Sequence, residues 1–433
     1  MDANRKTAYH TLLDMETNRA YSNLALNHHI LINKPDDPAF VRELVYGVLE
    51  NKMLFDHYLD QLIPKGVKSV KTQDLTILRM GLYQLDYMDA VPDYAAVNES
   101  VSLAKRYARG RSGFINGVLR NYQKKKDTLT LPSREEDEVA YLSVKYSYAP
   151  WIVQLWLDAY EDVSFVESLL AAGNEAPDLV IRLNWLKIMK KDLISALEER
   201  GIEVTEGKYS ANALHVKGSG ILESDLYKNG LFSVQDEASQ LVAQILNPQQ
   251  GDTVVDVCAA PGGKTMAIAE RMNNRGRIIA QDIYKRKIAL IEREAVRLGV
   301  NIVETRTWDS TRVDSTLVGK ADCVLVDAPC SGLGVVRHKP EIKYKAYNEE
   351  LAMLPQKQKA ILKAASQYVA AGGALVYSTC TINPRENEEI VSSFLRHHPN
   401  FMVEETKQLL PHINGTDGFF ICRMRKTSSI TQQ

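Results

Sequence analysis

The sequence contains little cysteine and no long apolar run, and each absence removes a class of protein. Its five cysteines are an odd number with none of the paired spacings of a zinc site. Neither a disulfide framework nor a metal site is therefore expected. No stretch approaches the roughly 18 apolar residues that a membrane span needs. The polar N-terminus leads into no apolar signal core. We expect a cytoplasmic protein that does not contact a membrane.

The chain is long and of ordinary composition. With 433 residues it is too large for one ordinary core, so two or three domains are expected. A hydrophobic fraction of 45% and a charged fraction of 25% are typical of a soluble globular protein.

The net charge of −1 conceals an uneven distribution. Residues 101–126 contain eight basic residues and no acidic one, and the mostly acidic segment 134–138 follows closely. A basic block of this size favours nucleic acid as a partner, although a solvated basic helix face has the same composition. The candidate phosphate contacts are Lys105, Arg106, Arg109, Arg111, Lys124, Lys125 and Lys126, with Arg337 in a second basic cluster.

The hydrophobic pattern divides the chain into three regions. Residues 1–126 show helical periodicity, with a cap and a first-turn proline at Asp37-Pro38, and predict an all-α bundle. Residues 127–230 mix short strands and helices and predict a small α+β module. In residues 231–433 apolar strands alternate regularly with helical segments, which predicts a Rossmann-like α/β domain with a mainly parallel sheet. Its expected strands are Thr253–Val257, Arg277–Ala280, Asp322–Val326 and Ala374–Tyr377.

A glycine-containing turn follows the first strand of the α/β domain. The segment Asp256–Thr265 reads Asp-Val-Cys-Ala-Ala-Pro-Gly-Gly-Lys-Thr, and a helix is expected to start near Lys264. A strand, a tight turn and a helix N-terminus form a cradle of nucleotide size. The glycines let a ligand approach the backbone. The spacing matches neither a P-loop nor the dinucleotide pattern.

Two aspartates follow the next two expected strands after this turn. Asp282 closes the second strand, where a carboxylate can accept both hydroxyls of a ribose. Asp309 falls at the end of the next strand, where it can accept a hydrogen bond from an adenine amine. The alternatives are a helix cap for Asp282 and a turn residue for Asp309. The placement at successive strand ends favours S-adenosylmethionine as the cofactor.

Two cysteines follow apolar strands, at the sheet edge where ligands of parallel sheets bind. Cys330 ends Asp-Ala-Pro-Cys, which begins at Asp327, and Cys380 ends Ser-Thr-Cys. The pair suggests covalent chemistry at one shared pocket. The other three cysteines are expected to be small buried hydrophobes, the usual state of a free cysteine, and these are Cys258, Cys323 and Cys422.

Paired thiols suit the methylation of a nucleobase on carbon. A thiolate that adds to the neighbouring ring carbon makes the target carbon nucleophilic. A helix expected to begin near Arg385 would favour the Cys380 thiolate through its positive end. A second group such as Cys330 could assist the departure of the proton and the thiol, and Asp327 could stabilise charge in the adduct. On these grounds alone, either thiol could attack.

The motifs around these residues resemble those of one enzyme family. Asp256–Thr265, Asp327–Gly334 and Ser378–Thr381, continued by Asn383–Glu388, are similar to motifs I, IV and VI of the RNA cytosine-carbon-5 methyltransferases of the Nol1/Nop2/Sun family. The likeness covers residues 231–426. It implies a Rossmann-like catalytic domain that uses S-adenosylmethionine.

The N-terminal region resembles the antitermination factor NusB, notably in Asn98–Lys105 and Phe114–Arg120. A NusB-like RNA-binding domain joined to this catalytic domain is the arrangement of a branch that methylates a cytosine of 16S ribosomal RNA. The implied partner is that RNA, either naked or within a partly assembled small subunit, and a monomer is expected.

The resemblance also implies a role for each candidate residue. Cys380 becomes the nucleophile, Cys330 the helper in product release, and Asp327 a contact of both cofactor and base. The implied S-adenosylmethionine contacts are Cys258, Ala259, Ala260, Pro261, Gly262, Gly263, Lys264, Asp282, Asp309 and Asp327.

Two other functions fit part of the pattern. A DNA cytosine methyltransferase would use the cysteine of Pro-Cys, here Cys330, as its nucleophile, but the later Thr-Cys and the NusB-like region argue against it. An RNA-binding assembly or antitermination factor could keep the cofactor fold without turnover. The presence of Asp327 together with both cysteines argues against that function.

Overall fold

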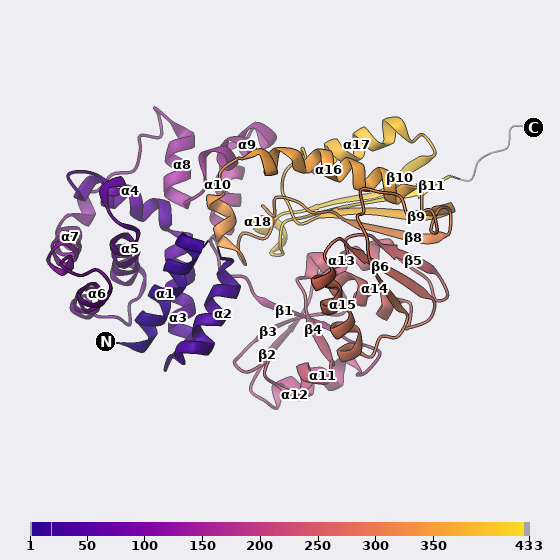
Figure 1. Ribbon diagram of the computed structural model, residues 1–433, viewed down its shortest axis with the longest axis horizontal. Helices are drawn as coiled ribbons and strands as arrows, with labels where there is room; N and C mark the ends of the chain where they lie inside the picture. The colour runs from indigo at the N-terminus through magenta and orange to yellow at the C-terminus, as the bar shows by residue number, and fades with distance from the viewer. Residues whose placement is uncertain (1, 19, 428–433) are drawn as a thin grey trace, which may run out of the picture. The chain divides into compact units, whose positions relative to one another are not determined.

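The computed structural model describes residues 2–18 and 20–427, which pack into two compact units (Figure 1). One unit combines residues 1–175 with the later segment 336–346. The other combines residues 176–335 with residues 347–433. Among the described helices, none has the length and apolar character that a membrane crossing requires.

The first unit is helical, as the sequence predicts for residues 1–126. Asp37 caps the third helix by accepting a hydrogen bond from Phe40 N at 3.0 Å, and Pro38 occupies its first turn. Buried side chains such as Leu44, Phe55 and Ile77 fill the core. The helices are α1 (Ala3–Asn18), α2 (Ser22–Asn33), α3 (Pro38–Glu50), α4 (Lys52–Leu62), α5 (Thr72–Tyr87), α6 (Asp93–Tyr107), α7 (Ser112–Lys125), α8 (Glu138–Tyr146), α9 (Pro150–Tyr160) and α10 (Val163–Ala172).

The segment 336–346 completes the core of this unit although it lies far along the chain. It contains the short 3-10 helix η3 (Pro340–Tyr344). Lys343 is fully buried there, and its Nζ donates to Glu50 O at 3.0 Å. Ala149 N donates to Lys343 O at 2.9 Å. This insertion has no local sequence pattern and was not expected.

The second unit begins with a small antiparallel sheet in the order β2-β3-β1-β4. Its strands are β1 (Leu179–Leu183), β2 (Glu203–Glu206), β3 (Ala213–Lys217) and β4 (Phe232–Val234), with helices α11 (Lys190–Glu198) and α12 (Asp225–Lys228). Apolar side chains of the strands and of α11 form a common core, including Ile181, Leu193 and Leu214. The sequence prediction of a small α+β module is confirmed in this part.

A seven-stranded sheet forms the rest of this unit, in the order β10-β11-β9-β8-β5-β6-β7. The five strands from β9 to β7 are parallel, and β10 and β11 are antiparallel additions. The strands are β5 (Thr253–Asp256), β6 (Arg277–Asp282), β7 (Val303–Thr307), β8 (Ala321–Asp327), β9 (Val369–Thr379), β10 (Phe401–Leu409) and β11 (Phe419–Lys426).

Helices cover both faces of this sheet, so the predicted doubly wound α/β domain is confirmed. One core joins the sheet to α13 (Glu237–Leu246), α14 (Gly263–Arg271) and α15 (Lys285–Leu298). The other joins it to α16 (Glu349–Ser366) and α17 (Glu388–His397). A short helix, α18 (Pro411–Asn414), connects β10 to β11. The carboxyl ends of the parallel strands therefore meet at one edge, where ligands of such sheets bind.

One local expectation was wrong. The helix after Cys380 begins at Glu388 rather than near Arg385. Residues 384–387 form a turn instead, in which Glu386 N donates to Asn383 O at 2.9 Å. Asn387, the N-cap residue of α17, nevertheless hydrogen-bonds Thr379 and Thr381, so the start of this helix stays close to the residues that flank Cys380.

Candidate active site

Cys330 and Cys380 lie together at the carboxyl edge of the sheet. Cys380 directly follows β9, and Cys330 follows the neighbouring parallel strand β8 by three residues. Their Sγ atoms are 3.4 Å apart and share a thiol hydrogen bond. Both side chains are partly buried. The two thiols that the sequence places after strand ends therefore share one site.

The Cys330 loop is held close to the Cys380 backbone. Gly334 N donates to Cys380 O at 3.0 Å. A side chain at Gly334 would collide with the backbone, because its Cβ would lie 1.8 Å from Gly418 O. The glycine of this loop therefore permits a close approach of two main-chain segments.

Lys264 and Asp327 form an ion pair beside the thiols. Lys264 Nζ lies 2.8 Å from Asp327 Oδ2, and Ser378 Oγ donates to Asp327 Oδ1 at 2.9 Å. Burial opposes the charge of Lys264, but the Asp327 carboxylate raises its pKa above the usual value, and the Cys380 sulfur adds to this effect. A protonated amine therefore stands near Cys380, where it can stabilise a thiolate.

The thiols differ in their surroundings. The hydrogen bond with Cys380, burial and the charges of Glu386 and Asp327 all raise the pKa of Cys330 well above its usual value. These contacts therefore oppose deprotonation of Cys330. Burial likewise raises the pKa values of the remaining cysteines, which are Cys258, Cys323 and Cys422. Cys323 and Cys422 lie in strands with little exposure, in agreement with the buried state expected for them.

The glycine turn forms the cradle that its sequence suggests. It connects β5 to α14, and Gly262 has a φ of +112°, a conformation that favours glycine. Ala259 N donates to Gln281 O at 2.8 Å, which ties the turn to β6. The N-terminus of α14 adds backbone donors, as in other anion-binding and nucleotide-binding turns.

Asp256 lies at the base of this cradle and is 1% exposed. Its Oδ2 accepts a hydrogen bond from Thr265 Oγ1 at 2.7 Å, whereas Oδ1 is buried with no hydrogen-bond partner among the described residues. Burial raises the pKa of Asp256 to about 7. A buried acceptor without a donor fits a site whose ligand supplies one.

Asp282 and Asp309 stand at the next two strand ends. Asp282 Oδ1 accepts from Tyr284 N at 2.9 Å, and Asp309 Oδ1 accepts from Thr311 N at 3.1 Å. The turn role that was the alternative for Asp309 is therefore present, whereas Asp282 makes a turn contact with Tyr284, the N-cap residue of α15, and does not cap that helix. Each role uses Oδ1, and a carboxylate has a second oxygen that can accept hydrogen bonds from a ribose or an adenine.

Sequence reasoning missed two charged residues that support this region. Arg182, on β1, donates from Nη1 to Gly263 O at 2.9 Å and forms a buried ion pair with Glu270 at 2.8 Å. An arginine inside the apolar run Leu179–Leu183 was the available signal. Glu386, on the turn after Cys380, accepts hydrogen bonds from Ser331 in the Cys330 loop. Glu386 belongs to the Asn383–Glu388 segment of the family motif, but its spacing in the sequence does not predict the contact with Ser331.

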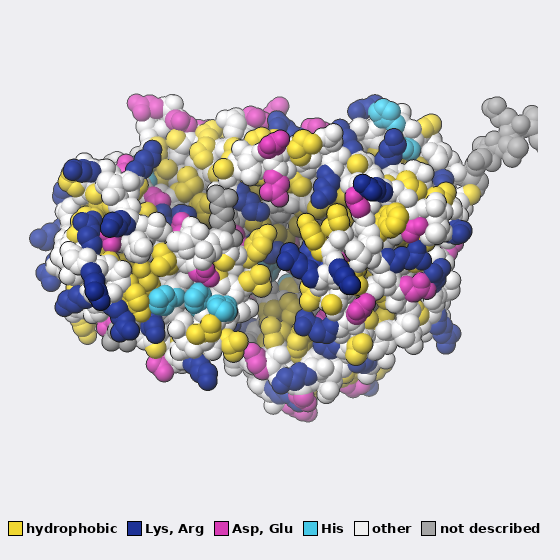
Figure 2. Space-filling view, in the orientation of Figure 1, with side chains coloured by type: hydrophobic (Ala, Val, Ile, Leu, Met, Phe, Trp, Pro, Cys, Tyr) yellow, Lys and Arg dark blue, Asp and Glu magenta, His cyan; other side chains and the backbone are white. Residues whose placement is uncertain are grey.

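Most of the predicted phosphate contacts are exposed, but two of them are not. Figure 2 shows Lys and Arg side chains gathered over the part of the first unit where α6 and α7 lie. The exposed residues of this set are Lys105, Arg106, Arg109, Lys124, Lys125 and Lys126. Arg111 instead pairs with Asp74 at 2.8 Å and lies over the Phe114 ring. Arg337 is only 8% exposed, so it presents little surface to a phosphate.

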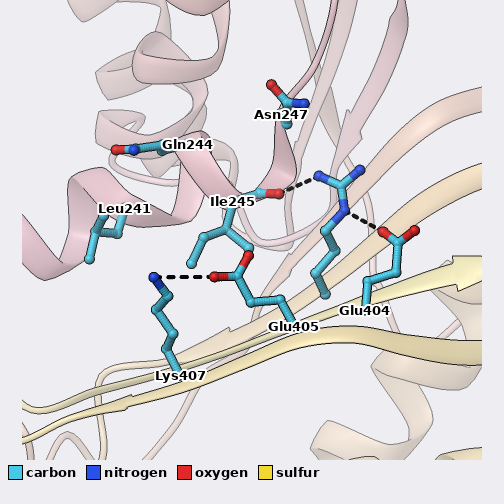
Figure 3. Close-up of a pocket in the computed structure, with 8 residues that line it drawn as sticks. Leu241, Gln244, Ile245, Asn247, Glu404, Glu405 and Lys407 are labelled. Carbon is cyan, nitrogen blue, oxygen red and sulfur yellow. Dashed lines mark hydrogen bonds and ion pairs between the residues drawn. The ribbon is translucent and has the colours of Figure 1, made fainter. Parts of the chain in front are cut away.

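A separate cavity of about 380 Å³ lies between α13 and the β10–β11 pair (Figure 3). Its charged side chains are already paired: Lys407 with Glu405 at 3.2 Å, and Arg423 with Glu404 at 2.6 Å. None of the candidate site residues lines it. The candidate site at the sheet edge is therefore separate from this cavity.

Comparison with known families accounts for most of the chain. Residues 243–425 match the family described as 16S rRNA methyltransferase RsmB/F, and residues 2–124 match the NusB family. Residues 148–222 match the ferredoxin-like domain of RsmF/B-like methyltransferases. The "Probable ribosomal RNA small subunit methyltransferase B" of Bacillus subtilis is 39% identical over 98% of both chains.

The chain belongs to the RsmB/F family of 16S rRNA methyltransferases. The ribosomal RNA small subunit methyltransferase B of Proteus mirabilis is 31% identical over 90% of both chains. The NusB-like and methyltransferase regions expected from sequence are confirmed. S-adenosylmethionine is the methyl donor of this family, and the cradle, the buried acceptor and the strand-end carboxylates fit it.

Solved structures support the fold. The crystal structure of PH0851 superposes with a TM-score of 0.82 at 25% identity, and the match covers 97% of this chain and 98% of that one. NSun6 from Pyrococcus horikoshii, crystallised with SFG, has a TM-score of 0.58 at 23% identity over 64% of this chain and 98% of its own. The second likeness bears on the fold alone.

Proposed function

We propose that this protein transfers a methyl group to carbon 5 of one cytosine in 16S ribosomal RNA. In this proposal Cys380 attacks carbon 6 of the base and Cys330 assists release of the product. The 3.4 Å separation of the two Sγ atoms carries the proposal. Two sulfurs at this separation can both reach one pyrimidine ring.

The bond changes follow from the chemistry of the thiolate. Addition of Cys380 Sγ to carbon 6 opens the double bond between carbons 5 and 6 and makes carbon 5 nucleophilic. S-adenosylmethionine would supply an electrophilic methyl group to carbon 5 and leave as S-adenosylhomocysteine. Loss of the carbon 5 proton then re-forms the double bond and expels the Cys380 sulfur. Cys330, which shares a hydrogen bond with Cys380, can give its proton to the departing sulfur and, as a thiolate, take the carbon 5 proton.

The ion pair beside the thiols serves the first step. The Lys264 ammonium stabilises the Cys380 thiolate before attack, and its position is fixed by Asp327 at 2.8 Å. The Asp327 carboxylate can also hydrogen-bond a ring nitrogen of the cytosine and so stabilise charge in the adduct. We assign the cofactor contacts to the cradle residues Cys258 to Lys264, with Asp282, Asp309 and Asp327.

The substrate base must leave its stack to reach the two thiols. We assign the phosphate contacts to six exposed basic residues on or next to α6 and α7, because phosphate neutralisation supplies most of the affinity for RNA. They are Lys105, Arg106, Arg109, Lys124, Lys125 and Lys126. The protein acts as a monomer in the cytoplasm, on naked RNA or on a partly assembled small subunit.

The test incubates small-subunit rRNA and labelled S-adenosylmethionine with the wild-type protein and two variants. Cys380→Ala should abolish transfer. Cys330→Ala should accumulate a covalent protein–RNA adduct that survives a denaturing gel. Full turnover by Cys380→Ala would remove the nucleophile from the proposal, and absence of the adduct would remove the release role of Cys330.

Two further readouts separate the alternatives. Preferential methylation of DNA over RNA would identify a DNA methyltransferase instead. Tight RNA binding by the wild-type protein without any methyl transfer would identify a non-catalytic binding factor. Bisulfite sequencing of rRNA from cells that lack this protein locates the modified cytosine.

A further inference from the structure

Glu386 is a buried carboxylate at the centre of a hydrogen-bond network next to the thiols. It lies on the turn between Cys380 and α17 and is 1% exposed. Its oxygens accept hydrogen bonds from Ser331 N at 2.9 Å, Ser331 Oγ at 2.5 Å, Gln358 Nε2 at 2.9 Å and Asn383 Nδ2 at 2.8 Å. Burial of a carboxylate costs free energy unless hydrogen-bond donors compensate for the lost water, and Glu386 has four such donor contacts.

This network joins the two cysteine loops. Ser331 directly follows Cys330, and its Oγ also lies 2.7 Å from Thr381 Oγ1, in the residue after Cys380. Gln358 Nε2 donates to Pro329 O at 2.9 Å as well as to Glu386. Glu386 therefore fixes the chain on both sides of Cys330, directly at Ser331 and through Gln358 at Pro329.

The turn that carries Glu386 is itself anchored to β9. Tyr377 Oη donates to Glu386 O at 2.6 Å. Asn387 accepts from Thr379 Oγ1 at 2.5 Å and donates to Thr381 O at 3.0 Å. Because these contacts come from the end of β9 and from Thr381, on both sides of Cys380, the position of Glu386 is set relative to that thiol.

Charged side chains act on both sulfurs. Glu386 and Asp327 are among the groups that raise the pKa of Cys330, after its hydrogen bond with Cys380 and its burial. On the other side, Cys380 contributes to raising the pKa of Lys264. Glu386 and Asp327 therefore act on Cys330, and Lys264 acts on Cys380.

We propose that Glu386 is a positioning residue that locks the Cys330 loop against Cys380 and, through its charge, keeps Cys330 as the thiol that does not attack. This deepens the proposed function and rests on it for the roles of the thiols. In this proposal Glu386 determines which thiol attacks and which assists release, without contacting substrate or cofactor itself.

The charge part is tested without RNA or cofactor, by alkylation of Cys330 with iodoacetamide across pH, followed by peptide mass spectrometry. The Cys380→Ala protein is compared with the Cys380→Ala, Glu386→Gln protein. The pH at which the alkylation rate of Cys330 reaches half its maximum should fall by about one unit when the negative charge of Glu386 is removed. An unchanged midpoint would overturn this part. The exposed Glu389→Gln in the same background is the matched control and should not shift it.

The tether part is tested by turnover. Ser331→Ala keeps the charge of Glu386 but removes one link between the loops, so it should slow methyl transfer and leave the alkylation midpoint unchanged. Glu386→Gln in the otherwise wild-type chain should lower turnover by roughly a hundredfold, because displaced catalytic groups lose rate steeply. Wild-type turnover in both variants would overturn the tether.

Melting curves of each variant separate misfolding from displacement of the loops, and Ser331→Ala gives a readout if Glu386→Gln fails to fold. If the wild-type protein methylates no RNA, but Glu386→Gln still shifts the alkylation midpoint of Cys330 in the Cys380→Ala background, the proposed function is refuted and the effect of the Glu386 charge on Cys330 still holds.

Discussion

Lys264 and Asp327 form an ion pair of 2.8 Å, with the lysine on the helix after β5 and the aspartate at the end of β8. The pair connects the cofactor turn to the motif that contains Cys330. A cation is thereby held near Cys380. In the proposed mechanism this ammonium stabilises the Cys380 thiolate.

Replacing Lys264 by methionine should suppress formation of the covalent adduct. The change removes the ammonium while keeping a side chain of similar length, so the Cys380 thiolate loses its stabilising charge. We expect single-turnover methyl transfer to fall by about 10²-fold, as measured with labelled methyl donor and excess enzyme. Lys264→Arg retains the charge and should recover part of the rate. Equal rates in wild type and Lys264→Met would contradict this role.

The thiols of Cys330 and Cys380 should readily form a disulfide under oxidation. Their sulfurs are 3.4 Å apart, so a small movement brings them to bonding distance. With hydrogen peroxide, the two thiols lose two protons and two electrons, and the peroxide is reduced to two water molecules. We expect methyl transfer to stop and to return after treatment with dithiothreitol. Mass spectrometry should find a Cys330–Cys380 linked peptide, which the Cys330→Ala protein cannot form.

The stability of the helical unit should vary with pH through Lys343 and Glu50. Burial lowers the pKa of Lys343 from 10.5 to about 7, and burial raises that of Glu50 from 4.5 to about 7. Between pH 7 and 10.5 only the unfolded lysine binds a proton, so stability rises with pH through Lys343. Between pH 4.5 and 7 only the folded glutamic acid binds one, so stability falls with pH through Glu50.

Denaturant midpoints across pH measure this effect. Lys343→Met should flatten the rise above pH 7, whatever its effect on stability at a single pH. Glu50→Gln should flatten the fall between pH 4.5 and 7 and leave the rise in place. Parallel profiles for wild type and both variants would show that neither group titrates in the folded protein within this range.

Gly334→Ala should disable the Cys330 loop. The new Cβ would meet Gly418 O at 1.8 Å, so the Cys330 loop and the segment of Gly418 must move apart. We expect loss of methyl transfer and a lower melting temperature. Gly117→Ala is the matched control, because a Cβ there meets nothing within 4 Å. It lies inside α7 and should stabilise the protein by about 0.5–1 kcal/mol. Equal activity of the Gly334→Ala protein would show that the loop is not under this constraint.

The features that sequence could predict are local. The Asp37-Pro38 cap, the glycine turn and the thiols after their strands all follow from neighbouring residues and from the topology of a parallel sheet. The strand order then brings Cys330 and Cys380 together, because β8 and β9 are adjacent. The family motifs added the expected roles of the two thiols.

The features that sequence could not predict depend on contacts between distant positions. Glu386 meets Ser331 across 55 positions, and Arg182 meets Glu270 across 88. Hydrophobic periodicity in the sequence does not predict contacts between such distant positions. The start of α17 was placed too early because the residues after Pro384 can continue either a turn or a helix. Arg337 was assigned to the surface by its charge, whereas packing of its segment buries it.

The segment 336–346 has a consequence for the order in which the protein is made. The ribosome releases the helices of residues 1–172 long before it reaches Lys343, whose side chain completes their core. The first unit therefore cannot finish folding while it is the only part of the chain outside the ribosome. Its last piece arrives only after the glycine turn and Cys330 have been synthesised, so the two units reach their final form in the same late stage of synthesis.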